Sequence, residues 1–276
     1  MVEHRIADWN NAYANGANIA GGDRWPAAWD GPAQQFRDKL VAEGRARLDI
    51  MYGEAPRNRF DLFLPTTAPK GLVAFIHGGY WMESHKTSWS HLAGGAVGRG
   101  FAVAMPSYTL CPRTGISGIV NEVAAAIERA AAMIDGPLML TGHSAGGHLA
   151  SRMVTAASPL SSDVARRIRQ VVSISGLHDL RPLMFTALNE TLNIDEREAL
   201  SESPALLRPM QGTRITCWVG GGERSEFLRQ SALLANIWTG LGAATRSVVE
   251  PDRHHFDVVD GLADPDHPLT RTLVDE

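Results

Sequence analysis

The segment GHSAG at residues 142–146 constrains the fold of this chain more than any other feature of the sequence. An apolar stretch typical of a buried strand, residues 137–141, precedes it, and a helical pattern over residues 145–157 follows it. Glycines on both sides of Ser144 predict a sharp turn from strand to helix, because a larger side chain would collide with that turn. The turn lifts the Ser144 hydroxyl above the edge of a sheet; the alternative is a glycine-rich turn with an exposed serine.

The remainder of the chain alternates strand and helix patterns. Two segments alternate polar and apolar residues, as half-buried antiparallel strands do: 45–52 and 59–64. Apolar runs and a last alternating segment predict further strands at 71–76, 101–105, 137–141, 171–175, 215–219 and 245–250. Helical patterns lie between them at 88–99, 121–134, 145–157 and 227–241. We therefore expect residues 1–276 to form a single α/β domain with a mostly parallel central sheet flanked by helices.

Two segments depart from this rhythm. Residues 1–40 hold Trp9, Trp25 and Trp29 among scattered Asn, Gly and Pro residues, which predicts short helices and loops laid over the main domain. Residues 178–207 have the pattern of a helical insertion between two strands. We expect both to lie near the carboxyl ends of the strands as a small helical cap. The alternative is an N-terminal arm that only packs against the core.

Composition excludes several classes of function. The chain has 26 basic and 30 acidic residues, a formal net charge of −4, so no basic surplus indicates a nucleic acid or an anionic membrane as partner. No apolar run is long enough for a transmembrane helix. Two cysteines, Cys111 and Cys217, exclude a disulfide framework and favour a cytoplasmic location. The sequence leaves a homodimer open.

A second glycine motif, HGGYW at residues 77–81, directly follows the predicted strand 71–76. Glycines allow backbone N–H groups to approach a ligand closely. Such a loop donates hydrogen bonds to the oxyanion of a tetrahedral intermediate. We predict an oxyanion hole formed by the N–H groups of Gly79, Tyr80 and Ala145.

Taken together, these motifs resemble those of α/β-hydrolases of the hormone-sensitive-lipase-like group, and most of all its kynurenine formamidase (arylformamidase) branch. That branch carries H-G-G-x-W, which matches residues 77–81, and residues 107–112 resemble the Y-x-L-x-P segment of the group. Residues 226–231 and 255–257 are similar to late motifs of the branch. The resemblance implies the α/β-hydrolase fold, a serine triad without cofactor and a role in tryptophan catabolism, with N-formyl-kynurenine as substrate.

The chain order in this fold is nucleophile, acid, histidine. Glu223 follows the strand that ends at residue 219, which places it at the same sheet edge as Ser144, and it is our choice for the acid. Relatives mostly have Asp there. Glu226 and Asp179 are the alternatives. His255, beyond the last strand, is the predicted base, with His254 as its alternative.

These roles predict hydrolysis of a small-molecule ester or amide through an acyl-Ser144 intermediate, without a metal. His143, His148 and the histidines near residue 254 lack the spacing of a metal site. A formyl group needs almost no acyl pocket, and Trp81 and Tyr108 are the expected substrate-binding aromatic residues. Tryptophans of the arm would add further walls if it covers the site. The alternatives are a general carboxylesterase for short acyl esters and a non-catalytic binding module.

Overall fold

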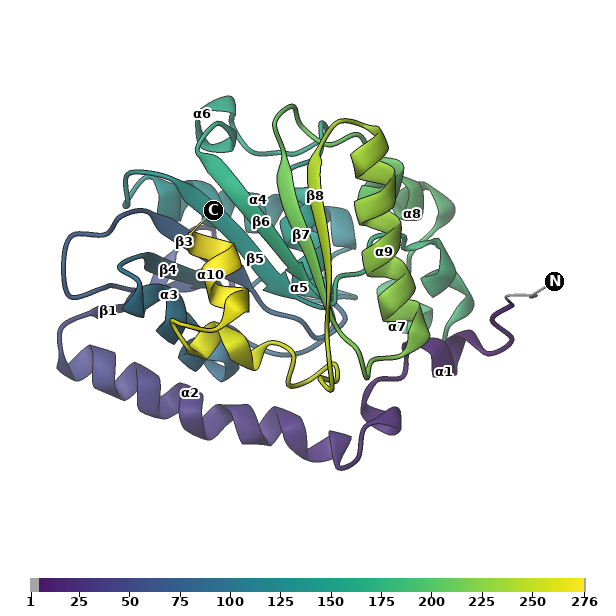
Figure 1. The fold of residues 1–276 in the computed structure, drawn as a ribbon, viewed down its shortest axis with the longest axis horizontal. Coiled ribbons are helices and arrows are strands. Elements are labelled where there is room, and N and C mark those ends of the chain that lie inside the picture. The colour runs from purple at the N-terminus through teal and green to yellow at the C-terminus, as the bar shows by residue number, and fades with distance from the viewer. Residues whose placement is uncertain (1–4, 276) are drawn as a thin grey trace.

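The computed structural model describes residues 5–275, which form an eight-stranded sheet between two layers of helices (Figure 1). The strands are β1 (Ala46–Met51), β2 (Arg59–Phe63), β3 (Leu72–Ile76), β4 (Ala102–Pro106), β5 (Leu138–His143), β6 (Ile168–Ile174), β7 (Arg214–Gly220) and β8 (Ala244–Glu250). Their order is β1-β2-β4-β3-β5-β6-β7-β8. β2 pairs antiparallel with β1 and β4, and the strands from β4 to β8 run parallel. The fold is that of an α/β-hydrolase.

The helices cover both faces of this sheet. They are α1 (Trp9–Tyr13), α2 (Trp25–Ala42), α3 (Gly94–Gly98), α4 (Ile116–Ala131), α5 (Ala145–Arg152), α6 (Ser162–Ala165), α7 (Asn189–Leu192), α8 (Glu196–Glu202), α9 (Ser225–Gly240) and α10 (Pro268–Val274). Short 3-10 helices are η1 (Gly16–Asn18), η2 (Gly22–Arg24), η3 (Lys86–Ala93), η4 (Arg181–Phe185), η5 (Pro204–Leu206) and η6 (Asp260–Ala263). None of the helices within residues 5–275 has the length and hydropathy of a membrane span.

The continuous apolar runs of the sequence form strands that are buried on both sides. In β3, Leu72, Ala74 and Ile76 belong to the core beneath α4, α5 and α9. Val73 and Phe75 point the other way, into the core shared with α3, α10 and α2. Successive side chains of a strand alternate between faces, so a strand covered by two helical layers must be apolar throughout.

The turn between β5 and α5 has the sharp geometry that the sequence predicts. Ser144 lies there at φ 56° and ψ −117°, an unusual conformation for a residue with a side chain. A Cβ atom on Gly142 would lie 2.3 Å from the carbonyl oxygen of Gly146. One on Gly146 would lie 1.9 Å from the carbonyl oxygen of Ile76. Only glycine fits at either position, because both contacts are to backbone.

The N-terminal arm has the predicted short helices, α1, η1 and η2, up to residue 24, and departs from the prediction after that. It contains α2, an 18-residue helix with Pro32 inside it. Trp29 packs against Trp89 of η3 with ring centroids 4.4 Å apart, and Phe36 lies edge-on to Phe63. Tertiary packing of this face stabilises the helix although Pro32 removes one of its hydrogen bonds. Figure 1 shows α2 running along the outside of the domain, at the bottom of the view.

Two other helical segments are divided more finely than the sequence pattern predicts. The stretch expected as one helix at 88–99 is η3 followed by α3, and four consecutive glycyl or alanyl positions at 93–96 mark the change. The insertion at 178–207 contains η4, α7, α8 and η5.

Candidate active site

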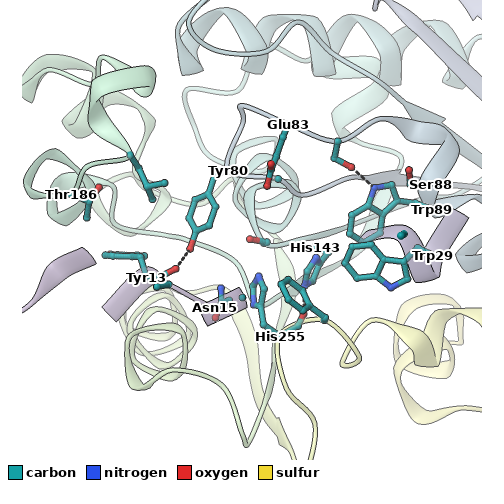
Figure 2. A pocket seen from close by; sticks show the side chains of 18 of the residues that line it. Tyr13, Asn15, Trp29, Tyr80, Glu83, Ser88, Trp89, His143, Thr186 and His255 are labelled. Atoms are coloured by element: carbon teal, nitrogen blue, oxygen red, sulfur yellow. Dashed lines mark hydrogen bonds between the residues drawn. The ribbon is translucent and has the colours of Figure 1, made fainter. Parts of the chain in front are cut away.

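A cavity of about 600 Å³ opens where the parallel strands end (Figure 2). Ser144, His143 and His255 line it from the sheet side. Other segments complete its wall: Asn10, Tyr13, Ala14, Asn15, Gly16, Ala27, Trp29 and Asp30 from the arm, Gly79, Tyr80, Glu83, Ser84, Ser88 and Trp89 from the region after β3, Thr186, Ala187 and Leu188 from the insertion, and Phe256. The arm and the insertion therefore both reach the cavity that contains Ser144.

The His255 and Glu223 side chains are hydrogen-bonded beside this cavity. His255 Nδ1 lies 2.6 Å from Glu223 Oε2, and both residues are buried. The other carboxylate oxygen accepts hydrogen bonds from the Ser175 hydroxyl and from the Gly220 N–H, the latter at 2.8 Å. A carboxylate held in this way keeps the proton of the imidazole on Nδ1, which leaves Nε2 as the basic nitrogen.

The HGGYW loop lies directly against Ser144. A Cβ atom on Gly78 would approach the Ser144 Cβ to 3.2 Å and the His143 carbonyl oxygen to 2.8 Å. Gly79 has a φ of 105°, which favours glycine. Within residues 5–275, the N–H groups of Gly79, Tyr80 and Ala145 donate to no backbone carbonyl. Free N–H groups beside a serine at a helix N-terminus provide the geometry that an oxyanion hole needs.

This chain is similar to known proteins over most of its length. The BD-FAE family model matches residues 60–209. The kynurenine formamidase of Danio rerio is 32% identical over 239 residues, which cover 82% of this chain and 80% of the relative. That of Drosophila melanogaster is 25% identical, covering 84% and 78%. The chain belongs to the kynurenine formamidase family of α/β-hydrolases. It is therefore related to hydrolytic enzymes over most of its length.

Solved structures agree on the fold of this hydrolase. A candidate thioesterase from Silicibacter sp. tm1040 superimposes with a TM-score of 0.92 at 47% identity, covering 96% of this chain and 98% of the other. The Pyrobaculum calidifontis esterase has a TM-score of 0.68 at 16% identity, covering 88% and 90%, and shows the fold alone.

The alternative acids of this hydrolase have other partners. Glu226 accepts hydrogen bonds from Arg229 at 2.7 Å and from the Tyr13 hydroxyl at 2.8 Å. Asp179 pairs with Arg181 at 2.9 Å. His254, the alternative base, accepts hydrogen bonds through Nδ1 from nearby backbone N–H groups. The structure thus brings Glu223 and His255 together and leaves the three alternatives apart from that pair.

His143 has a position in the site that the sequence reasoning did not assign. Its Nε2 lies 2.7 Å from the His255 carbonyl oxygen, and the two rings have centroids 4.6 Å apart. Burial lowers the pKa of His143 well below its ordinary value, so the ring stays neutral and donates from Nε2. Its place immediately before Ser144 is a sequence signal from which this position could be inferred. The spacing of His143 and His148 in the sequence bears only on metal binding, which it does not favour.

Neither histidine belongs to a metal cluster in the part of the chain that the structure describes. His148 is a buried residue of α5, and its Nε2 lies 2.6 Å from the Glu202 carbonyl oxygen. Burial lowers the pKa of His148 to about 3, which keeps it a neutral donor to that carbonyl.

Trp81 and Tyr108, expected as substrate-binding residues, do not line the cavity. Trp81 is 0% exposed and packs edge-on against His148. Tyr108 is also fully buried and donates a hydrogen bond from its hydroxyl to the His77 carbonyl oxygen at 3.0 Å. Trp81 anchors its own end of the HGGYW loop in the core, and Tyr108 holds the other end through the His77 carbonyl. The expectation of direct substrate contact is corrected, because this loop turns its Trp81 inward while Tyr80 faces the cavity.

Aromatic walls come instead from Trp29, Trp89, Phe256 and Tyr80. Trp29 of the arm lies over Trp89. Phe256 is edge-on to Trp29, with ring centroids 5.7 Å apart. Of the three arm tryptophans that the sequence analysis considered, only Trp29 is among the described lining residues. Trp25 lies behind it, against His254 and Phe256.

Proposed function

We propose that this protein is a metal-independent serine hydrolase that cleaves an aryl formamide such as N-formyl-kynurenine. The observation that carries the proposal is the His255–Glu223 pair beside Ser144 in a cavity with aromatic walls. Membership of the kynurenine formamidase family supports the choice of substrate.

In the first half of the reaction, His255 Nε2 takes the proton of Ser144 as its oxygen attacks the formyl carbon. The carbonyl oxygen becomes an oxyanion, which the N–H groups of Gly79, Tyr80 and Ala145 stabilise. The C–N bond then breaks, and the proton on His255 passes to the aryl nitrogen, which leaves as the free amine. The formyl group remains as an ester on Ser144.

In the second half, His255 takes a proton from water as the water oxygen attacks the formyl ester. Collapse of the second oxyanion breaks the bond to Ser144, which recovers the proton from His255. Formate is released. Glu223 stabilises the imidazolium that forms twice in each cycle.

The wall of the cavity supports an aryl leaving group that carries an amino-acid side chain. Trp29, Trp89 and Phe256 provide flat apolar surfaces for the ring. Two carboxylates, Asp30 and Glu83, are in the wall, and none of the described lining residues is Lys or Arg. Figure 2 shows the Glu83 side chain turned toward the cavity. This distribution of charge favours the ammonium group of N-formyl-kynurenine, whereas the described lining offers no cationic side chain to its carboxylate.

A general carboxylesterase for short acyl esters is the second candidate. The 47% identity to a candidate thioesterase and the largely apolar wall favour it, because acyl esters and thioesters use the same serine chemistry. A non-catalytic binding module is disfavoured, since nucleophile, acid and base are all present.

The deciding measurement is kcat/KM for N-formyl-kynurenine beside that for p-nitrophenyl acetate and p-nitrophenyl butyrate. We expect the formamide to be preferred. Turnover of the butyrate with no cleavage of the formamide would assign the protein to the esterases. A fluorophosphonate probe that fails to label Ser144 would overturn both enzymatic candidates.

A further inference from the structure

The end of the HGGYW loop has a strained backbone. Gly79, Tyr80 and Trp81 all have positive φ angles, of 105°, 45° and 57°. For the two residues with side chains, this conformation costs about 1 kcal/mol or more each, so surrounding contacts must maintain it. The position of the Tyr80 N–H, one of the proposed oxyanion donors, depends on those contacts.

The Trp81 side of the strained segment is held by the core. Its indole is fully buried, and its carbonyl oxygen accepts a hydrogen bond from the Cys111 N–H at 2.9 Å. These contacts come from the main domain. They orient residue 81 but leave the Tyr80 side chain free to point into the cavity.

The Tyr80 side is held by the N-terminal arm. The Tyr80 hydroxyl donates a hydrogen bond to the backbone carbonyl oxygen of Tyr13. Figure 2 shows the Tyr80 ring reaching across the cavity wall to this partner. A direct hydrogen bond thereby joins the strained loop to the arm, although the two tyrosines are 67 residues apart in the sequence.

Tyr13 is in turn fixed to α9 by its own side chain. Its hydroxyl donates to Glu226 Oε1 at 2.8 Å and accepts from Gln230 Nε2 at 3.1 Å. Arg229 pairs with the same carboxylate at 2.7 Å. Burial, with the Glu226 charge, raises the pKa of Tyr13 above its ordinary range, so the hydroxyl keeps its proton and remains a donor.

The same turn of α9 also contacts the proposed base. Phe227 lies between the two, with ring centroids 4.6 Å from His255 and 6.1 Å from Tyr13. The first turn of α9 is therefore a common support for the arm and for the histidine loop.

We propose that the hydrogen-bonded chain from Tyr80 through Tyr13 to Glu226 and Gln230, called here the arm latch, positions the oxyanion hole. The Tyr80 side chain makes it a positioning residue. Its hydroxyl keeps the backbone of residue 80 in the conformation that directs the N–H group toward the oxyanion. The arm thus contributes to the reaction rate as well as to the cavity wall. The proposal rests on the serine mechanism of the proposed function and is independent of which acyl substrate is natural.

The test begins with Tyr80→Phe, which removes the hydroxyl and keeps the ring. Tyr52→Phe is the matched control, because the Tyr52 hydroxyl also donates to a backbone carbonyl, that of Ser107, and Tyr52 does not line the cavity. We expect Tyr80→Phe to lower kcat by about ten- to a hundredfold with little change in KM, because misplacing one oxyanion donor costs part of its full effect. Tyr52→Phe should leave both constants unchanged.

Three readouts keep the latch separate from the choice of substrate. They are kcat on p-nitrophenyl acetate, kcat on N-formyl-kynurenine, and the rate of Ser144 labelling by a fluorophosphonate. If the ester reacts and the formamide does not, the proposed substrate fails while the latch is still measured by the ester and the probe. Equal kcat for Tyr80→Phe and Tyr52→Phe, or a loss of Tm with unchanged kcat, would overturn the latch.

A double-mutant cycle tests the far end of the latch. Tyr13→Phe removes the hydroxyl that binds Glu226 but keeps the carbonyl that accepts from Tyr80. We expect it to lower kcat in the same direction as Tyr80→Phe, and the double variant to be no slower than Tyr80→Phe alone, because both substitutions break one chain of contacts. Effects that multiply independently would contradict the coupling.

Discussion

The sheet edge that carries Ser144 and the arm that carries Trp29 and Tyr13 meet in one cavity but are held in place differently. At the sheet edge, position follows from backbone space: Gly146 has no room for a Cβ beside the Ile76 carbonyl. In the arm, position follows from side chains, namely the packing of Trp29 against Trp89 and the Tyr13 hydrogen bonds to α9.

This difference separates two kinds of constraint on the hydrolase. Residues on tight turns after buried strands have one available position, since moving them would break the sheet. Residues of the arm are placed by a few contacts that single substitutions can remove. We therefore expect changes at the sheet edge to abolish the chemistry, and changes in the arm to alter rate and substrate choice by smaller factors.

The largest expected effect is that of Ser144→Ala. Without the nucleophile, kcat should fall by about 10⁶-fold, because no acyl intermediate can form. The mutant should retain the wild-type thermal unfolding temperature within a few degrees and should not react with a fluorophosphonate. The wild-type enzyme should keep its activity in EDTA. A Ser144→Ala variant with full activity would remove the serine mechanism.

The next effect compares two carboxylates, one at the sheet edge and one on α9 that holds the arm through Tyr13. Glu223→Gln should lower kcat by about 10⁴-fold, since the amide cannot hold the imidazole tautomer or stabilise the imidazolium. Glu226→Gln weakens the arm latch and leaves the pair of Glu223 and His255 intact, so its loss of kcat should be far smaller. Steady-state kinetics of both variants on one substrate checks the order, and the reverse order would transfer the acid role to Glu226.

A smaller effect is expected from the aromatic wall of the arm. Trp29→Ala should lower kcat/KM for an aryl formamide by about tenfold, because the aryl ring of the substrate loses a flat apolar contact. Trp25→Ala is the control, as that tryptophan belongs to the same helix but not to the described lining. Hydrolysis of ethyl formate, which has no ring, should change little in either variant. Equal losses for Trp25→Ala and Trp29→Ala would show that the arm acts only by its general packing.

The last prediction concerns the pH dependence of stability, where the two regions also differ. Burial lowers the pKa of His77 to about 3, of His148 to about 3 and of His178 to about 4, from an ordinary value near 6.5. Below pH 6.5 the unfolded chain binds protons that the folded protein does not. The free energy of unfolding should therefore fall as the pH drops from 6.5 toward 4, by up to about 1.4 kcal/mol per pH unit for each group.

Urea unfolding at several pH values measures this slope. His148→Gln should reduce this slope by the contribution of up to one bound proton. The glutamine amide can donate a hydrogen bond to the Glu202 carbonyl and does not bind a proton in this pH range. All three histidines lie in the main domain, and the described part of the arm contains none. A slope that is flat between pH 6.5 and pH 4.5 would contradict the buried, neutral state of these rings.

Much of the sheet edge could be predicted from the sequence because its determinants are local. The glycines flanking Ser144, the HGG run after β3 and the carboxylate after β7 each mark a turn within a few residues of a buried strand. Parallel strands then bring their carboxyl ends to one edge whatever the intervening segments contain. These short patterns determined the fold class and the residues of the proposed triad.

Only the tertiary structure decided how the arm completes the site. Tyr13 meets Glu226 across 213 residues of sequence, and no pattern near either residue marks the other as its partner. The same holds for α2, which is helical through Pro32 because its face packs on η3. It also holds for Trp81 and Tyr108, which resemble cavity residues in sequence but lie in the core. Such positions depend on packing between distant segments. The free energy of this packing is a sum over the assembled fold, and no local spacing in the sequence encodes it.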